Sequence, residues 1–192
     1  PKFKLNARTR FFSMEELASL WRATECLSAP KKSAFRMLIL LPLRTKELLL
    51  SGWHNVDRRW LVVPAERTKN NEESALFISD FAFSVLQTPA NETDLLFTTN
   101  NRTPLVLGTK ISVKITAESG VSNWVYHDIR RTFSTHLNER GHPSHIIEAC
   151  LNHSDPTRRG VAGVYNRAEY RAAKQMVLQA WSDLVEEAVS GG

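Results

Sequence analysis

His127-Asp128-Ile129-Arg130-Arg131-Thr132-Phe133 opens a predicted helix that runs to about Arg140. His127 and Arg130 are three residues apart, so their side chains lie on one face of such a helix. The buried side of this helix is predicted to carry the apolar residues at helical spacing, namely Ile129, Phe133 and Leu137. Taken alone, this pattern is more typical of a capped helix with solvated basic residues than of a catalytic element. Its meaning therefore depends on the rest of the chain.

The downstream sequence adds a second histidine and a tyrosine. Leu151-Asn152-His153 follows a predicted helix end, and asparagine tolerates the left-handed backbone that would project His153 sharply. Tyr165 follows, beside Asn166-Arg167. Histidines and arginines that hold a phosphate, with a tyrosine to attack it, suit cleavage of a phosphodiester. A lone histidine at a helix end is more often a cap, and a lone tyrosine in an amphipathic segment is more often core.

Two other tyrosines compete with Tyr165 for the role of nucleophile. Tyr126 immediately precedes His127, and this backbone position disfavours independent reach to the same phosphate. Tyr170 falls well around the helix from Tyr165 and is predicted to be a packing residue. Tyr165 is therefore the candidate nucleophile.

Two further cationic candidates precede this region. Arg44 follows Leu41-Pro42-Leu43, and Glu47 is one turn further along a short predicted helix. The ordinary interpretation is an ion pair within that helix, worth roughly 0.2–0.5 kcal/mol. Lys69 lies in a polar turn between two predicted strands, where most lysines are simply solvated.

The hydrophobic pattern predicts a mostly helical domain with one small antiparallel sheet. A capping box at Ser13-Met14-Glu15-Glu16 begins a helix that runs to about Leu27, and Pro30 breaks it. Three short strands are predicted over residues 53–56, 60–63 and 75–78. Further helices are predicted over about 31–41, 44–50, 80–86, 108–118, 127–140, 144–151, 157–165 and 169–189. The last carries an apolar stripe at helical spacing, Met176, Val177, Ala180, Trp181, Leu184, Val185 and Ala188.

Composition limits the class of protein. The 192 residues, 42% of them hydrophobic and 23% charged, suffice for one domain with a buried core. The net charge of +5 mildly favours a polyanionic partner. No apolar run approaches the ~18 residues of a membrane span. The start, Pro1-Lys2-Phe3-Lys4, has neither a methionine nor a signal peptide, so we expect the chain to be a fragment of a larger protein.

Cysteine and histidine spacing gives no sign of a metal site. Cys26 and Cys150 lie far apart and fit buried, reduced thiols of a cytoplasmic protein. His142 and His145 have no third or fourth ligand nearby. No carboxylate cluster suggests the two-metal site of many nucleases. We therefore expect no metal and no other cofactor.

In combination, these elements resemble the catalytic domain of the tyrosine recombinases, the phage-integrase family. Leu41-Pro42-Leu43-Arg44-Thr45-Lys46-Glu47-Leu48, followed by Trp53, resembles the first arginine box of that family, and residues 127–133 closely match the second. Leu151-Asn152-His153 resembles its Leu-Gly-His element. The tyrosine segment and the helix end that resemble prophage and genomic-island integrases are Val164-Tyr165-Asn166-Arg167-Ala168-Glu169-Tyr170 and Gln179-Ala180-Trp181. The resemblance covers nearly the whole chain in order, but Pro42 and Asn152 stand where the family commonly has glycine.

The resemblance implies a fold and a reaction. The fold would be α+β and mainly α, a helical catalytic domain with a three-stranded antiparallel sheet, known as the DNA breaking-rejoining fold. Tyr165 would attack a scissile phosphate, form a 3′-phosphotyrosyl bond and free a 5′-hydroxyl, without metal or ATP. The implied catalytic residues are Arg44, Lys69, His127, Arg130, His153 and Tyr165. Both arginines and His153 would hold the phosphate, His127 would help to accept the tyrosine proton, and Lys69 would protonate the leaving oxygen.

The resemblance also implies partners and a setting. Residues 1–192 would be the C-terminal catalytic domain of an integrase whose N-terminal DNA-binding domains are missing from this fragment. Its partners would be double-stranded DNA attachment sites and further copies of itself, as a homotetramer on DNA formed from free monomers, with possible accessory DNA-bending proteins and no membrane. The reaction would serve integration or excision of a prophage or genomic island, at the nucleoid in the bacterial cytoplasm. The helix after Tyr165 would pack on its own domain or on a neighbouring protomer.

Two alternative functions share parts of the pattern. A DNA-binding module with an inactive site would explain the basic character, but the intact set of candidate residues argues against decay. A type IB topoisomerase would use the same chemistry and would relax supercoils without site preference. The integrase-like neighbourhood of Tyr165 disfavours the second alternative.

Overall fold

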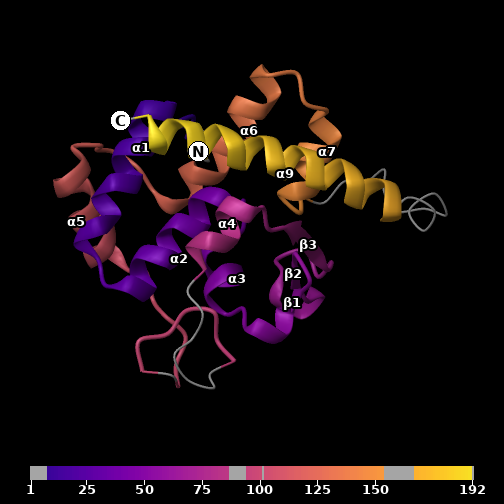
Figure 1. The fold of residues 1–192 in the computed structure, drawn as a ribbon, viewed down its shortest axis with the longest axis horizontal. Coiled ribbons are helices and arrows are strands. Elements are labelled where there is room, and N and C mark those ends of the chain that lie inside the picture. Colours follow the sequence, from indigo (N-terminus) through magenta and orange to yellow (C-terminus); the bar gives the residue numbers. More distant parts are fainter. Residues whose placement is uncertain (1–7, 87–93, 101, 154–166, 192) are drawn as a thin grey trace, which may run out of the picture.

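A long C-terminal helix, α9 (Arg167–Ser190), crosses the molecule and joins its parts (Figure 1). It packs against α1 (Met14–Ala23), α7 (Ser144–Cys150) and strand β3 (Ser74–Phe77). The structure is a computed structural model, and it describes residues 8–86, 94–100, 102–153 and 167–191. The predicted helix over 157–165 and the candidate Tyr165 lie outside the described residues.

The first two helices begin where local sequence signals place them. The predicted capping box is present, because Glu16 N donates to Ser13 Oγ at 3.2 Å and Ser13 N donates to Glu16 Oε2 at 3.0 Å. Helix α1 ends at Ala23, a 3-10 turn follows over Thr24–Cys26, and α2 covers Ala29–Leu40. Pro30 therefore lies in the first turn of α2 and does not break α1. Proline suits that position because its missing N–H would have no partner there.

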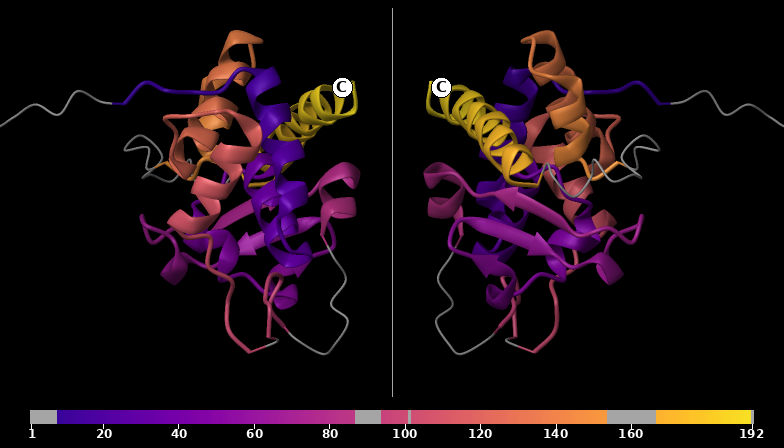
Figure 2. Two further views of the ribbon diagram at one scale, coloured as in Figure 1. Left: turned by 90° about the vertical axis from the view of Figure 1, so that its left-hand side faces the viewer. Right: turned by 90° about the vertical axis from the view of Figure 1, so that its right-hand side faces the viewer.

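The predicted three-stranded antiparallel sheet is confirmed, with strand order β1-β2-β3. Strand β1 is Val56–Asp57 and β2 is Trp60–Val63. Leu61 lies opposite Leu76, and both are fully buried. In both views of Figure 2 the strands lie below α9, in agreement with its contacts to β3.

The prediction of a strand over residues 53–56 was wrong for most of its length. Trp53–Asn55 forms a 3-10 turn instead. Gly52 N donates to Asn55 Oδ1 at 2.9 Å, and Asn55 N donates to Gly52 O at 2.9 Å. Such local side-chain bonds to the backbone compete with a strand, and only Val56 and Asp57 remain to pair with β2.

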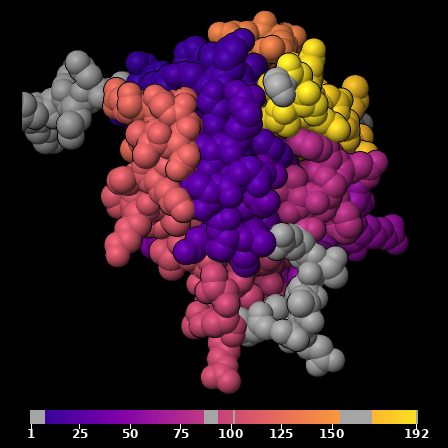
Figure 3. Space-filling model, turned by 60° about the vertical axis from the view of Figure 1, so that its left-hand side comes forward, coloured from indigo at the N-terminus to yellow at the C-terminus, as the bar shows by residue number. Residues whose placement is uncertain are grey.

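The remaining helices agree with the predicted positions within a residue or two. They are α3 (Thr45–Leu49), α4 (Asp80–Val85), α5 (Thr109–Ser119) and α6 (Tyr126–Glu139). In Figure 3 the indigo surface of α1 lies between the coral surface of α5 and the yellow end of α9. Among the described helices, none is both long enough and apolar enough to cross a bilayer.

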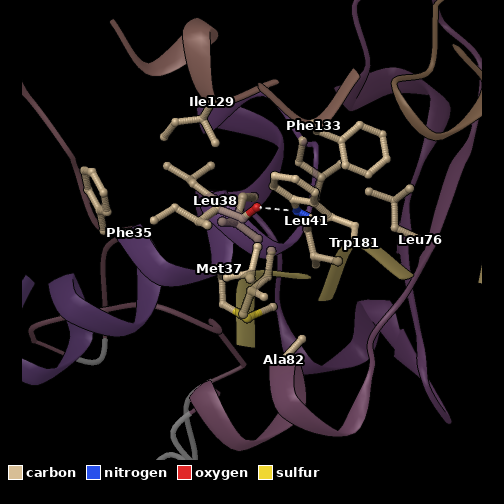
Figure 4. Packing of buried hydrophobic residues seen from close by; sticks show 14 of the residues in the cluster. Phe35, Met37, Leu38, Leu41, Leu76, Ala82, Ile129, Phe133 and Trp181 are labelled. Carbon is tan, nitrogen blue, oxygen red and sulfur yellow. Dashed lines mark hydrogen bonds between the residues drawn. The ribbon is translucent and has the colours of Figure 1, made fainter. Parts of the chain in front are cut away.

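Trp181 is the largest fully buried side chain of the core (Figure 4). Its ring lies 5.6 Å from that of Phe133, and its Nε1 donates to Ile39 O at 2.8 Å. Val177 and Val185 are buried as predicted, but Met176 is 73% exposed, so its place in the apolar stripe was wrong. The buried side is completed by Leu178 and Ser182 instead. Neither cysteine is in a disulfide; Cys150 is buried as predicted, whereas Cys26 is only half-buried.

Candidate active site

Arg130 joins the segments that carry the candidate residues. It lies in the second turn of α6 and is only 4% exposed. Its Nη1 donates to the carbonyl of Pro42, two residues before Arg44, and its Nη2 donates to Leu151 O at 2.6 Å. The same Nη2 lies 3.5 Å from His153 Nε2. One buried guanidinium therefore brings the turn before α3 and the turn after α7 to one place.

One nitrogen of the Arg130 guanidinium has no partner within the described part of the chain. This nitrogen, Nε, is buried. Burial, and then the positive charge of Arg44, lowers the pKa of Arg130 to about 10, which still leaves it cationic at neutral pH. An anion would stabilise this arrangement, because it would accept a hydrogen bond from the buried Nε and would offset the repulsion between Arg130 and Arg44. The electrostatics therefore favour a bound oxyanion here.

Arg44 is held by a buried carboxylate. It is the N-cap residue of α3, and its Nη1 donates to Glu47 Oε1 at 2.7 Å. Arg44 N donates to the other oxygen, Glu47 Oε2, at 2.9 Å, and Glu47 is only 3% exposed. Glu47 thus caps the helix and orients the arginine that precedes it. Pro42 fits this turn because Arg130 uses only its carbonyl and no N–H is needed there.

His153 is placed by the backbone turn that its sequence predicted. Asn152 has a φ of 50°, which is the left-handed conformation. His153 N donates to Glu148 O at 3.1 Å, and Asn152 N donates to Ala149 O at 3.3 Å, so the helix ends in a Schellman motif. His153 Nδ1 lies 2.5 Å from Glu148 Oε2. With Nδ1–H donating to this carboxylate, Nε2 carries a hydrogen only when the imidazole is protonated.

His127 lies in the first turn of α6, on the surface. Desolvation of its ring, and then the positive charges of Arg130 and Arg131, lower its pKa, while Asp128 acts in the opposite direction. A cation nearby disfavours the imidazolium form, so His127 stays neutral to a lower pH than an isolated histidine. A neutral imidazole can accept a proton.

The pKa of His127 should rise when one neighbouring cation is removed. In the wild-type chain, the His127 imidazole is expected to titrate below the ordinary value of about 6.5. In Arg131→Gln it is expected to titrate at a higher pH than in wild type, because repulsion of the imidazolium by the Arg131 charge is removed. An NMR titration of the histidine ring signals, assigned with His127→Gln, measures both. Arg22→Gln, an exposed change on α1, should leave this titration unchanged. A wild-type value at or above 6.5 contradicts the expectation.

The other two tyrosines, Tyr126 and Tyr170, lie in packed positions. Burial raises the pKa of Tyr126 to about 12, and its hydroxyl has no hydrogen-bond partner among the described residues. Its ring packs 5.5 Å from that of Trp124. Tyr170 is half-buried, with its ring 6.2 Å from that of His145, in agreement with the predicted packing role. Tyr165 itself is outside the described residues, so its candidacy stays a prediction.

Lys69 is exposed in the turn between β2 and β3. Its neighbour Asn70 is hydrogen-bonded to Asn152, which places this turn beside the turn that carries His153. The sequence did not single out Asn70 or Glu148. Asn70 had no detectable signal because its partner is 82 residues away. Glu148 did have a detectable signal, since a carboxylate in the last turn of a helix can reach a side chain just beyond the helix end, here His153.

Metal-ligating side chains do not gather in the part of the chain that the structure describes. Within it, no group of three or more His, Cys, Asp or Glu residues could hold a metal ion.

The sequence matches one protein family over most of its length. The family model described as the phage integrase family matches residues 9–183. Prophage integrase IntA of Escherichia coli (strain K12) is 29% identical over 181 residues, which cover 91% of this chain and 41% of that protein. Prophage integrase IntZ of the same strain is 29% identical over 192 residues, covering 93% and 45%. The chain thus spans less than half the length of these curated relatives.

Two solved structures share the fold. A lambda integrase dimer bound to a COC′ core site matches with a TM-score of 0.63 at 17% identity, covering 82% of this chain and 62% of that one. XerH site-specific recombinase bound to a palindromic difH substrate matches with a TM-score of 0.61 at 18% identity, covering 96% and 54%. The mainly helical architecture with its small antiparallel sheet is therefore that of the tyrosine-recombinase catalytic domain.

Proposed function

The chain belongs to the phage integrase family, and from this membership we propose that it is the catalytic domain of a site-specific DNA recombinase. It would cut and rejoin DNA to integrate or excise a prophage or genomic island, as the names of the prophage integrases IntA and IntZ suggest. The observation that carries the proposal is the buried, partly unpartnered guanidinium of Arg130 beside Arg44 and His153. A scissile phosphate is the anion that this arrangement suits.

In the proposed reaction, the Tyr165 oxygen attacks the phosphorus. A phosphorus–tyrosine bond forms and the bond to the 5′-oxygen breaks, leaving a 3′-phosphotyrosine and a free 5′-hydroxyl. The tyrosine proton passes to His127, whose lowered pKa keeps it neutral and able to accept. Lys69 gives a proton to the leaving 5′-oxygen. A 5′-hydroxyl of a partner strand reverses these steps and reseals the DNA without ATP.

The arginines have the electrostatic role in this proposal. A guanidinium offers paired donors in a rigid fork to the non-bridging phosphate oxygens. Arg44 is oriented by Glu47, and Arg130 by two backbone carbonyls, so both are preorganised before substrate arrives. His153 would donate a further bond from Nε2 while Glu148 holds the other side of its ring.

We propose double-stranded DNA attachment sites as the partner, bound by a homotetramer, with N-terminal domains of the whole protein supplying much of the recognition. The lambda integrase and XerH structures contain a core site and a difH substrate, which supports this assignment. Because its contacts to DNA would be made largely to phosphates, we expect the 192-residue chain alone to bind weakly and to lose affinity as the salt concentration rises.

A covalent trapping experiment tests the function. The 192-residue chain is incubated with a nicked duplex that carries an attachment site from its own genetic element, so that the freed strand diffuses away after cleavage. Wild type is expected to give a protein–DNA adduct that survives denaturation, and Tyr165→Phe to give none, because the nucleophile is removed. Tyr170→Phe is the matched control and should retain the adduct. An adduct of equal yield from Tyr165→Phe, or none from wild type, contradicts the proposal.

The same preparation separates the alternatives. Binding in a gel shift without adduct would favour the DNA-binding module. Relaxation of a supercoiled plasmid that lacks the attachment site would favour a topoisomerase. Site-dependent adduct formation is the result expected here.

A further inference from the structure

The turn between β2 and β3 is docked on the turn that follows α7 by a pair of asparagine amides. Asn152 Nδ2 donates to Asn70 Oδ1 at 3.1 Å, and Asn70 Nδ2 lies 3.3 Å from Asn152 Oδ1 and 3.2 Å from Asn152 O. Asn152 Nδ2 also lies 3.1 Å from Glu72 O. The two residues are 82 positions apart, so this amide pair is a tertiary link between the Lys69 turn and the His153 turn.

The Lys69 turn is also closed at its base. Thr68 Oγ1 lies 2.9 Å from both Ala65 O and Glu72 O, either of which can accept its hydrogen, and Glu72 N donates to Thr68 Oγ1 at 3.1 Å. Thr68 is 9% exposed. Lys69 therefore stands between a buried, bonded neighbour and the docked Asn70, and each adjacent Cα is about 3.8 Å away. The backbone of Lys69 is held relative to that of His153.

Asn152 has a second role besides shaping the helix end. Its φ of 50° is a conformation that glycine adopts with less strain. Glycine would end the helix equally well but has no amide to bond Asn70 and Glu72. The asparagine side chain thus adds a contact that the backbone turn does not need. Leu151, the residue just before Asn152, accepts a hydrogen bond from Arg130 Nη2. The docked turn therefore lies at the edge of the phosphate site.

We propose that Asn70 and Asn152 are positioning residues that hold the Lys69 turn against the phosphate site, so that the Lys69 ammonium reaches the leaving 5′-oxygen. This rests on the proposed function. Exposed lysines have high side-chain entropy, and a fixed backbone reduces the volume that the ammonium must search. Loss of the amide pair should therefore slow proton donation to the leaving group without disturbing the hold on the phosphate.

Leaving-group chemistry tests this step directly. Cleavage is compared on the ordinary attachment-site duplex and on one whose scissile 5′-oxygen is replaced by sulfur. A thiol has a pKa of about 8.5 and leaves as the thiolate without a proton from Lys69. Asn152→Gly and Asn70→Ala should each slow adduct formation about 10-fold on the oxygen substrate, a part of the 10²–10⁴ that a general acid contributes. Both should return to within about twofold of wild type on the sulfur substrate, as should Lys69→Ala.

The matched control is Asn71→Gly. Asn71 lies in the same turn, is exposed, has a φ of 56°, and its side chain forms no hydrogen bond among the described residues. Like Asn152→Gly, this variant replaces asparagine by glycine at a position with left-handed backbone. It should keep the wild-type rate on both substrates. A loss in Asn71→Gly equal to that in Asn152→Gly, rescued in the same way, would mean that stiffness of the turn matters and the amide pair does not.

The remaining outcomes are also decisive. Equal loss on both substrates for Asn152→Gly and Asn70→Ala would mean a defect in folding or phosphate binding and would overturn the positioning role. Wild-type rates in both variants on the oxygen substrate would overturn it as well. No adduct from wild type on either substrate would contradict the proposed function itself, and the two failures are therefore distinguishable.

Discussion

Arg130→Ala is expected to lower the rate of covalent adduct formation by about 10²–10³-fold, the usual effect of removing one preorganised donor to a developing oxyanion. The wild-type side chain is 4% exposed, bonds the carbonyls of Pro42 and Leu151, and keeps its Nε unpartnered among the described residues. Its loss removes the proposed phosphate donor and also the link between the two turns. The initial rate of adduct formation on the nicked substrate, at saturating DNA, is the measurement.

Two further variants sharpen the test of Arg130. Arg130→Lys keeps the charge but loses the fork, so most of the defect should remain. Arg140→Ala removes an exposed arginine just past the end of α6 and should leave the rate within about twofold of wild type, as surface changes usually do. A wild-type rate in folded Arg130→Ala, with folding checked by circular dichroism, would remove Arg130 from the site.

Trp181→Ala is expected to lower the free energy of unfolding by about 3–5 kcal/mol, the usual range for removing a large buried aromatic side chain. The indole is fully buried, lies 5.6 Å from the ring of Phe133, and donates to Ile39 O. The change leaves a cavity between α9, α6 and α2 and an unpaired carbonyl in α2. Urea denaturation followed by circular dichroism gives the free energy.

Met176→Ala is the matched control on the same helix. Met176 is 73% exposed, so its loss should change the free energy of unfolding by less than about 0.5 kcal/mol. Equal destabilisation by both changes would mean that α9 is not packed as described. Only folded protein can form the adduct. Trp181→Ala, on the helix that follows the Tyr165 segment, should therefore also lower the adduct yield in proportion to the unfolded fraction.

Local signals predicted the elements that depend on near neighbours. The capping box at Ser13 and the left-handed Asn152 both act within five residues, so the sequence contains the whole interaction. The error over residues 53–55 is also local, because an asparagine bond to Gly52 N replaced strand pairing. Met176 was misplaced because periodicity locates a face of a helix but not its edges.

The sequence by itself determined the identities and order of the candidate groups, and with them the family and the fold. Only the tertiary structure decided how these groups meet. Arg130 reaches Pro42 across 88 positions and Asn70 reaches Asn152 across 82, and contacts between such distant segments leave no periodic or spacing signal. The lowered pKa of Arg130 has the same origin, since burial and the approach of Arg44 exist only once the chain has folded.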